Sequence, residues 1–299
     1  MLSQTAELKK ESLNSYFHNV SLEASNEVSI TNQKKRVKSI AKGKTAKNAV
    51  NKFLKTGIIS WVILFIAWEL ASRAMSPEFL PGPIATFKGL KELALAGTLW
   101  ADIKISMIRV GIGWGRALLI AIPLGLLIGR FKVVKSIVEP LINFFRFIPA
   151  IGFLTLFLMW FGVGEESKLV LITYAAVFPI IINTIAGVAS IDPVKYQAAQ
   201  SLGANSIYTF FTVTVPGAIP NILTGVRLGL SSAIISIVAA EMLAASEGLG
   251  YLIFTSRLYY RTDWIFAGII VLGIIGFLAD KLIRFLAFKL FKFYGVAKQ

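Results

Sequence analysis

Long apolar runs separated by short polar connections dominate the sequence from Gly57 onward. Each run approaches the roughly 20 residues that an α-helix needs to cross a bilayer. Pro149 interrupts the third run and predicts a bend between two shorter helical pieces. The pattern therefore predicts an all-α, multi-pass membrane protein with about six transmembrane helices. We place these helices near residues 57–75, 106–129, 137–161, 168–190, 217–244 and 264–286.

Composition agrees with this pattern and divides the chain. Of 299 residues, 56% are hydrophobic and 16% are charged, whereas soluble domains carry about 25% charged residues. Residues 1–56 form a basic cytoplasmic tail, too polar to contain the apolar core of a signal peptide. Residues 57–290 form the membrane domain, and residues 291–299 a second short cytoplasmic tail.

The net charge of +15 is distributed unevenly. If the amino terminus is cytoplasmic, twenty Lys and Arg fall in cytoplasmic segments and six on the opposite side. This asymmetry predicts a plasma-membrane protein with both termini inside. It also accounts for most of the charge without nucleic acid, and the tail, which lacks an aromatic-interleaved motif, is expected to lie near anionic headgroups.

Candidate enzymatic chemistry is sparse. The chain has no cysteine and one histidine, His18, in the polar tail. Disulfides, thiolate chemistry and Cys/His metal sites are therefore excluded. Glu165 and Glu166 are adjacent, but we assign them to a solvated outer loop rather than to a catalytic pair. We expect no catalytic residue and no cofactor bound by this chain.

The connection 191–216, between the fourth and fifth predicted spans, contains several residues that favour helix ends and turns. Asp192 before a proline predicts a helix start, because its carboxylate can cap free amides. Gly203 is placed to end that helix in a left-handed conformation. Asn205 can cap a second short helix, and Pro216 opens the next element. A long loop structured in this way is usually functional.

One face of the first short helix is predicted to meet a partner. Val194, Ala198 and Leu202 share that face by helical spacing. The small side chains of Ala198 and Ala199 permit close approach of another surface. The helix therefore resembles one that docks into a groove.

The same segment resembles the Glu-Ala-Ala loop of ABC importer permeases. Gln197-Ala198-Ala199 is followed after three residues by Gly203, and after nine more by Val-Thr-Val-Pro216. The family pattern has Glu-Ala-Ala, Gly and Ile-x-Leu-Pro at the same spacing. Gln197 stands where the family usually has glutamate, so it keeps the length and loses the charge.

Four further segments resemble the nitrate, sulfonate, taurine and bicarbonate branch of that family. These segments are Phe79-Leu-Pro-Gly-Pro83, Arg146-Phe-Ile-Pro149, Trp160-Phe-Gly-Val-Gly-Glu-Glu-Ser-Lys168, and Thr224-Gly-Val-Arg227 leading to Ala239-Ala-Glu241-Met242. The resemblance spans about residues 57–290 and implies the type I importer architecture.

The resemblance also implies partners. Two copies of the chain would pair in the membrane as a homodimer, with two cytoplasmic ATPase subunits each gripping one 191–216 loop. Mg-ATP would bind those ATPase subunits, because this chain has no Walker motif. A periplasmic or lipid-anchored binding protein would deliver the substrate.

Ionisable and polar residues inside the spans are candidates for the substrate pathway, because burial of charge in a membrane needs a reason. An arginine can bind a planar oxyanion through paired N–H donors. The alternative is that the arginines pair with Glu69 or Glu241, and that the asparagines make interhelical hydrogen bonds. The candidates are Arg146, Asn143, Asn183, Arg109, Arg227 and Glu241. We favour Arg146, beside the Pro149 bend.

Small residues recur at helical spacing and predict close helix packing, with dimer contact as an alternative. They are Gly111, Gly113, Gly115, Gly225 and Gly229. The function that best fits all these features is the membrane subunit of an ATP-driven importer for nitrate, bicarbonate or a sulfonate such as taurine. The alternative is an ATP-independent secondary transporter or channel for a small anion, which leaves the structured loop unexplained.

Overall fold

The computed structural model describes residues 58–291, which are almost entirely helical. The predicted tails, 1–56 and 291–299, lie outside the described residues except for Phe291. The chain divides into two compact units at Leu70–Ala71, within α2. The elements are α2 (Ile58–Ala74), α3 (Pro83–Leu95), α4 (Thr98–Arg130), α5 (Lys132–Phe145), η1 (Ala150–Phe153), α6 (Leu154–Phe161), α7 (Glu165–Ala189), α8 (Pro193–Ser201), α9 (Ser206–Thr209), η2 (Phe210–Thr214), α10 (Val215–Ala244), α11 (Leu249–Leu258) and α12 (Thr262–Phe291).

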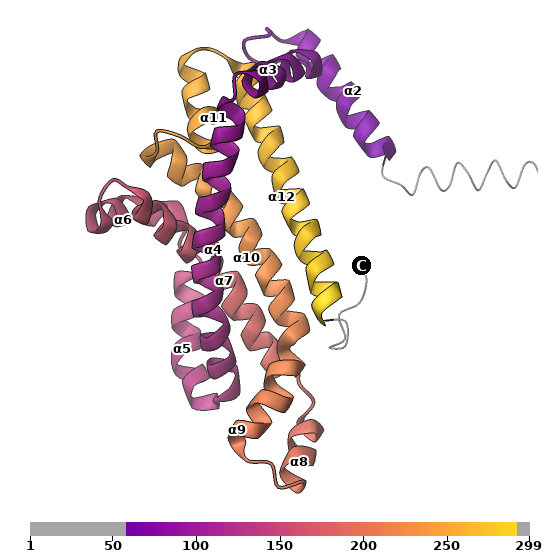
Figure 1. Cartoon of the computed structure of the whole chain (residues 1–299), viewed down its shortest axis with the longest axis vertical. Helices are drawn as coiled ribbons and strands as arrows, with labels where there is room; N and C mark the ends of the chain where they lie inside the picture. The colour runs from indigo at the N-terminus through magenta and orange to yellow at the C-terminus, as the bar shows by residue number, and fades with distance from the viewer. Residues whose placement is uncertain (1–57, 292–299) are drawn as a thin grey trace, which may run out of the picture. The chain divides into compact units, whose positions relative to one another are not determined.

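Four long apolar helical segments in the described chain can cross a membrane by length and composition. They correspond to the predicted second, fourth, fifth and sixth spans, and they contain α4, α7, α10 and α12. The predicted first span corresponds to α2, whose 17 residues lie at the lower end of the range for a transmembrane helix. In the second unit, α4, α7 and α10 pack against one another and α12 packs against α10 (Figure 1).

The predicted third span is bent, as its proline indicated. The helical pieces 132–145 and 150–161 meet at 87° across a four-residue break. Proline at 149 begins the second piece, because its ring fits the start of a helix and cannot continue one. The α6 helix consequently leaves the bundle sideways (Figure 1).

Close contact of α4, α7 and α10 depends on particular glycines. A Cβ atom on Gly113 would lie 2.7 Å from Cβ of Ile172, and one on Gly229 would lie 2.6 Å from Cγ1 of Ile180. By contrast, Gly111 and Gly115 have open space at that position. The predicted close packing therefore involves Gly113 rather than the glycines on either side of it.

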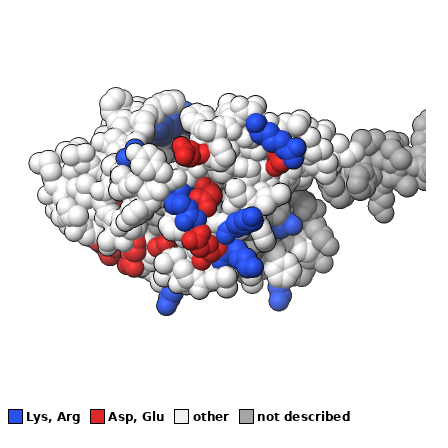
Figure 2. All heavy atoms as spheres, turned by 90° about the horizontal axis from the view of Figure 1, so that it is seen from above, with Lys and Arg blue, Asp and Glu red and all other residues white. Residues whose placement is uncertain are grey.

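The end of the bundle formed by α3, α11 and the start of α12 is rich in charge. Basic and acidic side chains intermingle on it (Figure 2). Arg261 donates to Glu92 at 2.6 Å and to Asp263 at 2.8 Å, joining α3 to α12. The hydrogen bond from Arg261 holds the pKa of the Glu92 carboxyl below its ordinary value. This ion pair consequently persists to lower pH than an isolated glutamate would allow.

The glycine contacts generate a matched test of packing. We expect Gly113→Ala to lower the free energy of unfolding by about 1–3 kcal/mol, because Ile172 must shift to admit a methyl group. The control Gly115→Ala adds its methyl group in open space and should leave stability unchanged or slightly higher. Thermal unfolding of both variants in detergent measures the difference, and equal melting temperatures would contradict the packing assigned here.

Candidate functional site

The 191–216 loop has the structure that its sequence predicts. The Asp192 carboxylate accepts from the N–H of Val194 at 2.8 Å and caps α8. Gly203 has φ +78° and ends this helix. The Asn205 side chain accepts from the N–H of Tyr208 at 2.7 Å and caps α9. Caps and turn together hold the loop as two short helices at one end of the bundle (Figure 1).

The junction of the loop with α10 contains a turn that was not predicted. Pro216 was expected to open the next element, and it lies in the first turn of α10. However, Ser206–Ala244 is a continuous helical segment, because the π turn η2 joins α9 to α10. A π turn widens the helix by one residue, which accommodates the missing N–H of the proline. The second short helix of the loop and α10 thus form one helical segment.

Apolar side chains cover the outer surface of the loop. We call them the loop knob: Val194 (63% exposed), Leu202 (88%), Ile207 (71%), Tyr208 (62%) and Phe211 (64%). Gln197 and Ala198 are exposed on the same short helix, whereas Ala199 is half-buried. A cluster of large exposed apolar residues at the end of a protein is typical of a docking surface. Of the two alanines predicted to face a partner, Ala198 is the exposed one.

A cavity of about 530 Å³ lies at the bend of the third predicted span. Arg146 is the charged residue among those that line it, and most of the other lining residues are apolar. The other lining residues are Ile148, Pro149, Ala150, Ile151, Tyr174, Ala175, Phe178, Pro179, Ile182, Ser232, Ile235, Ser236 and Ala239. We call this space the Arg146 cavity.

The Arg146 guanidinium is accessible to a ligand. The side chain is exposed, and its guanidinium carbon lies 4.7 Å from the centre of the Phe147 ring. Within residues 58–291, no carboxylate forms an ion pair with it. Two of the lining hydroxyls donate to backbone carbonyls, that of Tyr174 to Phe145 at 2.9 Å and that of Ser236 to Ala233 at 3.0 Å. Arg146 therefore supplies the available positive charge of this cavity.

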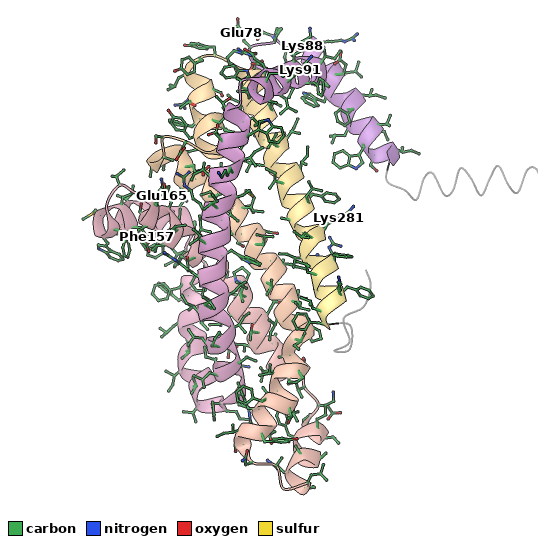
Figure 3. The ribbon with its side chains drawn as sticks, viewed as in Figure 1. Glu78, Lys88, Lys91, Phe157, Glu165 and Lys281 are labelled. Carbon is green, nitrogen blue, oxygen red and sulfur yellow. The ribbon has the colours of Figure 1, made fainter. Side chains whose placement is uncertain are left out.

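Arg109 lies elsewhere, in a buried ion network. Its side chain is 2% exposed. Nε and Nη2 donate to the two oxygens of Glu165 at 2.7 Å, and Nη1 donates to Glu241 at 2.8 Å. Glu165 also accepts from Lys168 at 2.7 Å. Figure 3 labels Glu165 close to α4, at the start of α7. The network joins α4, α7 and α10.

Glu241 connects this network to the start of α11. The carboxylate is fully buried and accepts from the hydroxyl of Ser106 at 2.8 Å and from the N–H of Gly250 at 2.9 Å. The N–H of Gly248 donates to Asp102 at 2.7 Å. Gly248 has φ +119°, and a Cβ there would collide with the Glu241 carboxylate. Only glycine fits at this position.

The remaining candidates do not line the Arg146 cavity. Arg227 pairs with Asp280 of α12 at 2.8 Å. The Asn183 amide donates to the carbonyl of Pro179 on its own helix at 2.7 Å, and Asn143 is exposed on α5. The structure therefore brings Arg146 to the cavity and places Arg109, Arg227 and Glu241 in ion pairs between helices.

Comparison with known proteins gives the family. A model described as "binding-protein-dependent transport system inner membrane component" matches residues 121–292. The taurine transport system permease protein TauC of Escherichia coli is 37% identical over 240 residues, covering 78% of this chain and 87% of TauC. The nitrate import permease protein NrtB of Synechocystis is 30% identical over 237 residues, covering 76% and 86%.

The chain belongs to this permease family. Its fold agrees with that assignment, because a chain of the MetNI methionine ABC transporter aligns with a TM-score of 0.58 at 18% identity, covering 69% of this permease and 99% of that chain. A chain of an amino acid ABC transporter aligns with a TM-score of 0.51 at 20% identity, covering 68% and 97%. The family resemblance read from the sequence is confirmed.

Two features of this permease differ from the sequence interpretation. Glu165 and Glu166 begin α7 and pair with Arg109 and Arg116, so their assignment to a loop was wrong, although both side chains are exposed as expected. Asp280 was not identified as a counter-charge. Its spacing of four residues from Arg284, with which it pairs, was the available signal.

The ion network predicts that substitutions of two arginines of α4 differ greatly in their effect on the stability of the permease. We expect Arg109→Gln to destabilise the permease by about 3–5 kcal/mol, because it leaves the Glu241 carboxylate buried without its cation. The control Arg116→Gln removes an exposed pair with Glu166 and should change stability by about 0–1 kcal/mol. Thermal unfolding in detergent compares them, and a harmless Arg109→Gln substitution would show that the network does not stabilise the fold.

Proposed function

We propose that this permease is the membrane-spanning subunit of an ATP-driven ABC importer for a small anion. The observation that carries the proposal is the loop knob, an exposed apolar surface on two capped helices, the second of which runs directly into α10. A rigid loop with such a surface suits docking into a cleft of an ATPase subunit. Mg-ATP would bind the partner subunits, and a binding protein would supply the substrate.

The assembly we propose contains two copies of this chain and two ATPase subunits. The excess of Lys and Arg in both tails and in the connection at Arg130, Lys132 and Lys135 supports a cytoplasmic position for both termini and for the side of the membrane on which the loop lies. The charged α3–α11 end would then face the outside, where a binding protein delivers the substrate. ATP-driven closure of the ATPase subunits would move the loops and alternate access to the pathway.

The Arg146 cavity supports an anionic substrate. Taurine and nitrate, named in the two relatives, both present oxygens that can accept paired N–H donors from a guanidinium. Arg146 is exposed to the cavity, and none of the other lining residues carries a charge that would offset its attraction for an anion. We infer that Arg146 contacts the anion, and that Arg109, Arg227 and Glu241 maintain the helices around the pathway.

The docking role predicts the effect of a charge on the loop knob. We expect Leu202→Glu to abolish co-purification of the ATPase subunit, because a carboxylate would be buried in the contact without a partner. Leu95→Glu is the control, because Leu95 of α3 is 78% exposed at the opposite end of the bundle. If Leu202→Glu leaves both ATPase binding and transport intact, the loop has been misassigned, and uptake that persists without any ATPase would indicate a secondary transporter.

The pathway role predicts a charge requirement at position 146. We expect Arg146→Gln to lower uptake of the transported anion by about tenfold or more, the effect of losing one charge-assisted hydrogen bond in a cavity. Arg146→Lys should retain part of the activity, since it keeps the charge and loses the paired geometry. Uptake of labelled taurine and labelled nitrate into proteoliposomes measures both variants. Equal uptake by wild type and Arg146→Gln would place the anion elsewhere.

A further inference from the structure

The α8 helix has an inner face that is distinct from the loop knob. Tyr196 and Ala199 lie three residues apart on this face, and both are half-buried. Val194 and Leu202 point outward and are 63% and 88% exposed. The outer face is therefore available to an ATPase, while Tyr196 faces the rest of its own chain.

The aromatic ring of Tyr196 contacts the end of α4. The guanidinium carbon of Arg130, the last residue of that helix, lies 5.1 Å from the ring centre. This arrangement is a cation–π contact, which attracts the guanidinium to the face of the ring. It joins α8 to a helix that is separated from it by more than 60 positions in the chain.

The hydroxyl of the same tyrosine reaches the π turn. It lies 3.2 Å from Oγ1 of Thr214, a fully buried residue at the end of η2. Because η2 leads without a break into α10, this bond joins α8 to a second long helix. π turns inside helices occur frequently at functional positions.

Other contacts at the base of the loop join different elements. Ile191 packs so closely on Gly217 that a Cβ there would lie 2.9 Å from its side chain. The Asn221 amide donates to the hydroxyl of Ser190 at 3.2 Å. These contacts hold the end of α7 against α10 and do not involve α4. Tyr196 combines contacts to α4 and to the π turn in one side chain.

We propose that Tyr196 is the positioning residue that transmits movement of α8 to α4 and α10 together. The inference rests on the proposed function, because it assumes that an ATPase moves α8. With Tyr196 in place, α8 moves with both helices as one body. Without it, the loop follows the ATPase while the end of α4 is released, so that ATP hydrolysis no longer drives the pathway efficiently.

The first experiment measures whether α8 and α4 move together. The chain has no cysteine, so Lys195→Cys on α8 and Leu119→Cys on α4 can be spin-labelled without background from the permease. Both side chains are exposed, and labelled copies are diluted with unlabelled ones in the complete complex. We expect Mg-ATP to leave the label-to-label distance unchanged with Tyr196 present and to change it in Tyr196→Leu. Identical responses of the two proteins would overturn the proposal.

The second experiment measures coupling in the same complex. We expect Tyr196→Leu to lower the number of anions transported per ATP at least about fivefold, as the hydrogen bond and the cation–π contact are both lost. Tyr196→Phe keeps the ring and should lower the number of anions transported per ATP by a smaller factor. Thr214→Val removes the hydroxyl partner and should resemble Tyr196→Phe, whereas Thr214→Ser keeps the hydroxyl and should resemble wild type.

The outcomes separate this proposal from the proposed function. If the wild-type permease neither binds an ATPase nor transports in an ATP-dependent manner, the proposed function fails. If wild type is coupled and Tyr196→Leu transports as many anions per ATP, the role of Tyr196 fails alone. Should Tyr196→Leu, Tyr196→Phe and Thr214→Val all fail to assemble, these residues serve folding, and the positioning role is likewise overturned.

Discussion

The ion network around Arg109 is the interaction on which the bundle most depends. A guanidinium buried among apolar helices is tolerable only if carboxylates and hydrogen bonds replace its water. Glu165 and Glu241 supply that compensation from α7 and α10, so one side chain of α4 determines where two other helices lie. The first turn of α11 is attached to the same network, because the N–H of Gly250 donates to Glu241. Apolar contacts stabilise the packing of these helices but are not directional, whereas the hydrogen-bonded ion pairs of the network specify the register of one helix against another.

Local chemistry made the 191–216 loop predictable. The caps at Asp192 and Asn205 join atoms two and three residues apart, and the turn at Gly203 depends on its own φ angle. The sequence around each of these residues therefore contains the whole interaction. The bend at Pro149 was predictable for the same reason, because proline disrupts the helix at its own position.

Interactions between distant segments were not predictable in this way. Arg109 pairs with Glu165, 56 residues away, and with Glu241, 132 residues away. The sequence indicated that a counter-charge was needed, but several carboxylates could supply it. Which glycine meets a neighbouring helix was equally undetermined, because adjacent positions point about 100° apart around the helix axis. Gly113 packs on Ile172, while Gly115, two positions along, does not. The overall architecture, which these long-range contacts stabilise, was predicted from the family resemblance.

The π turn at Phe210–Thr214 has a consequence for the orientation of the loop about the axis of α10. A π turn contains one residue more than an α turn, and each residue of an α-helix advances about 100° around the axis. If the same five residues adopted regular α-helical geometry instead, the extra residue would no longer be absorbed, and α9 and the loop would rotate by roughly that angle relative to α10. The π geometry of this turn, as much as any side chain on it, therefore sets the direction in which the permease presents its loop.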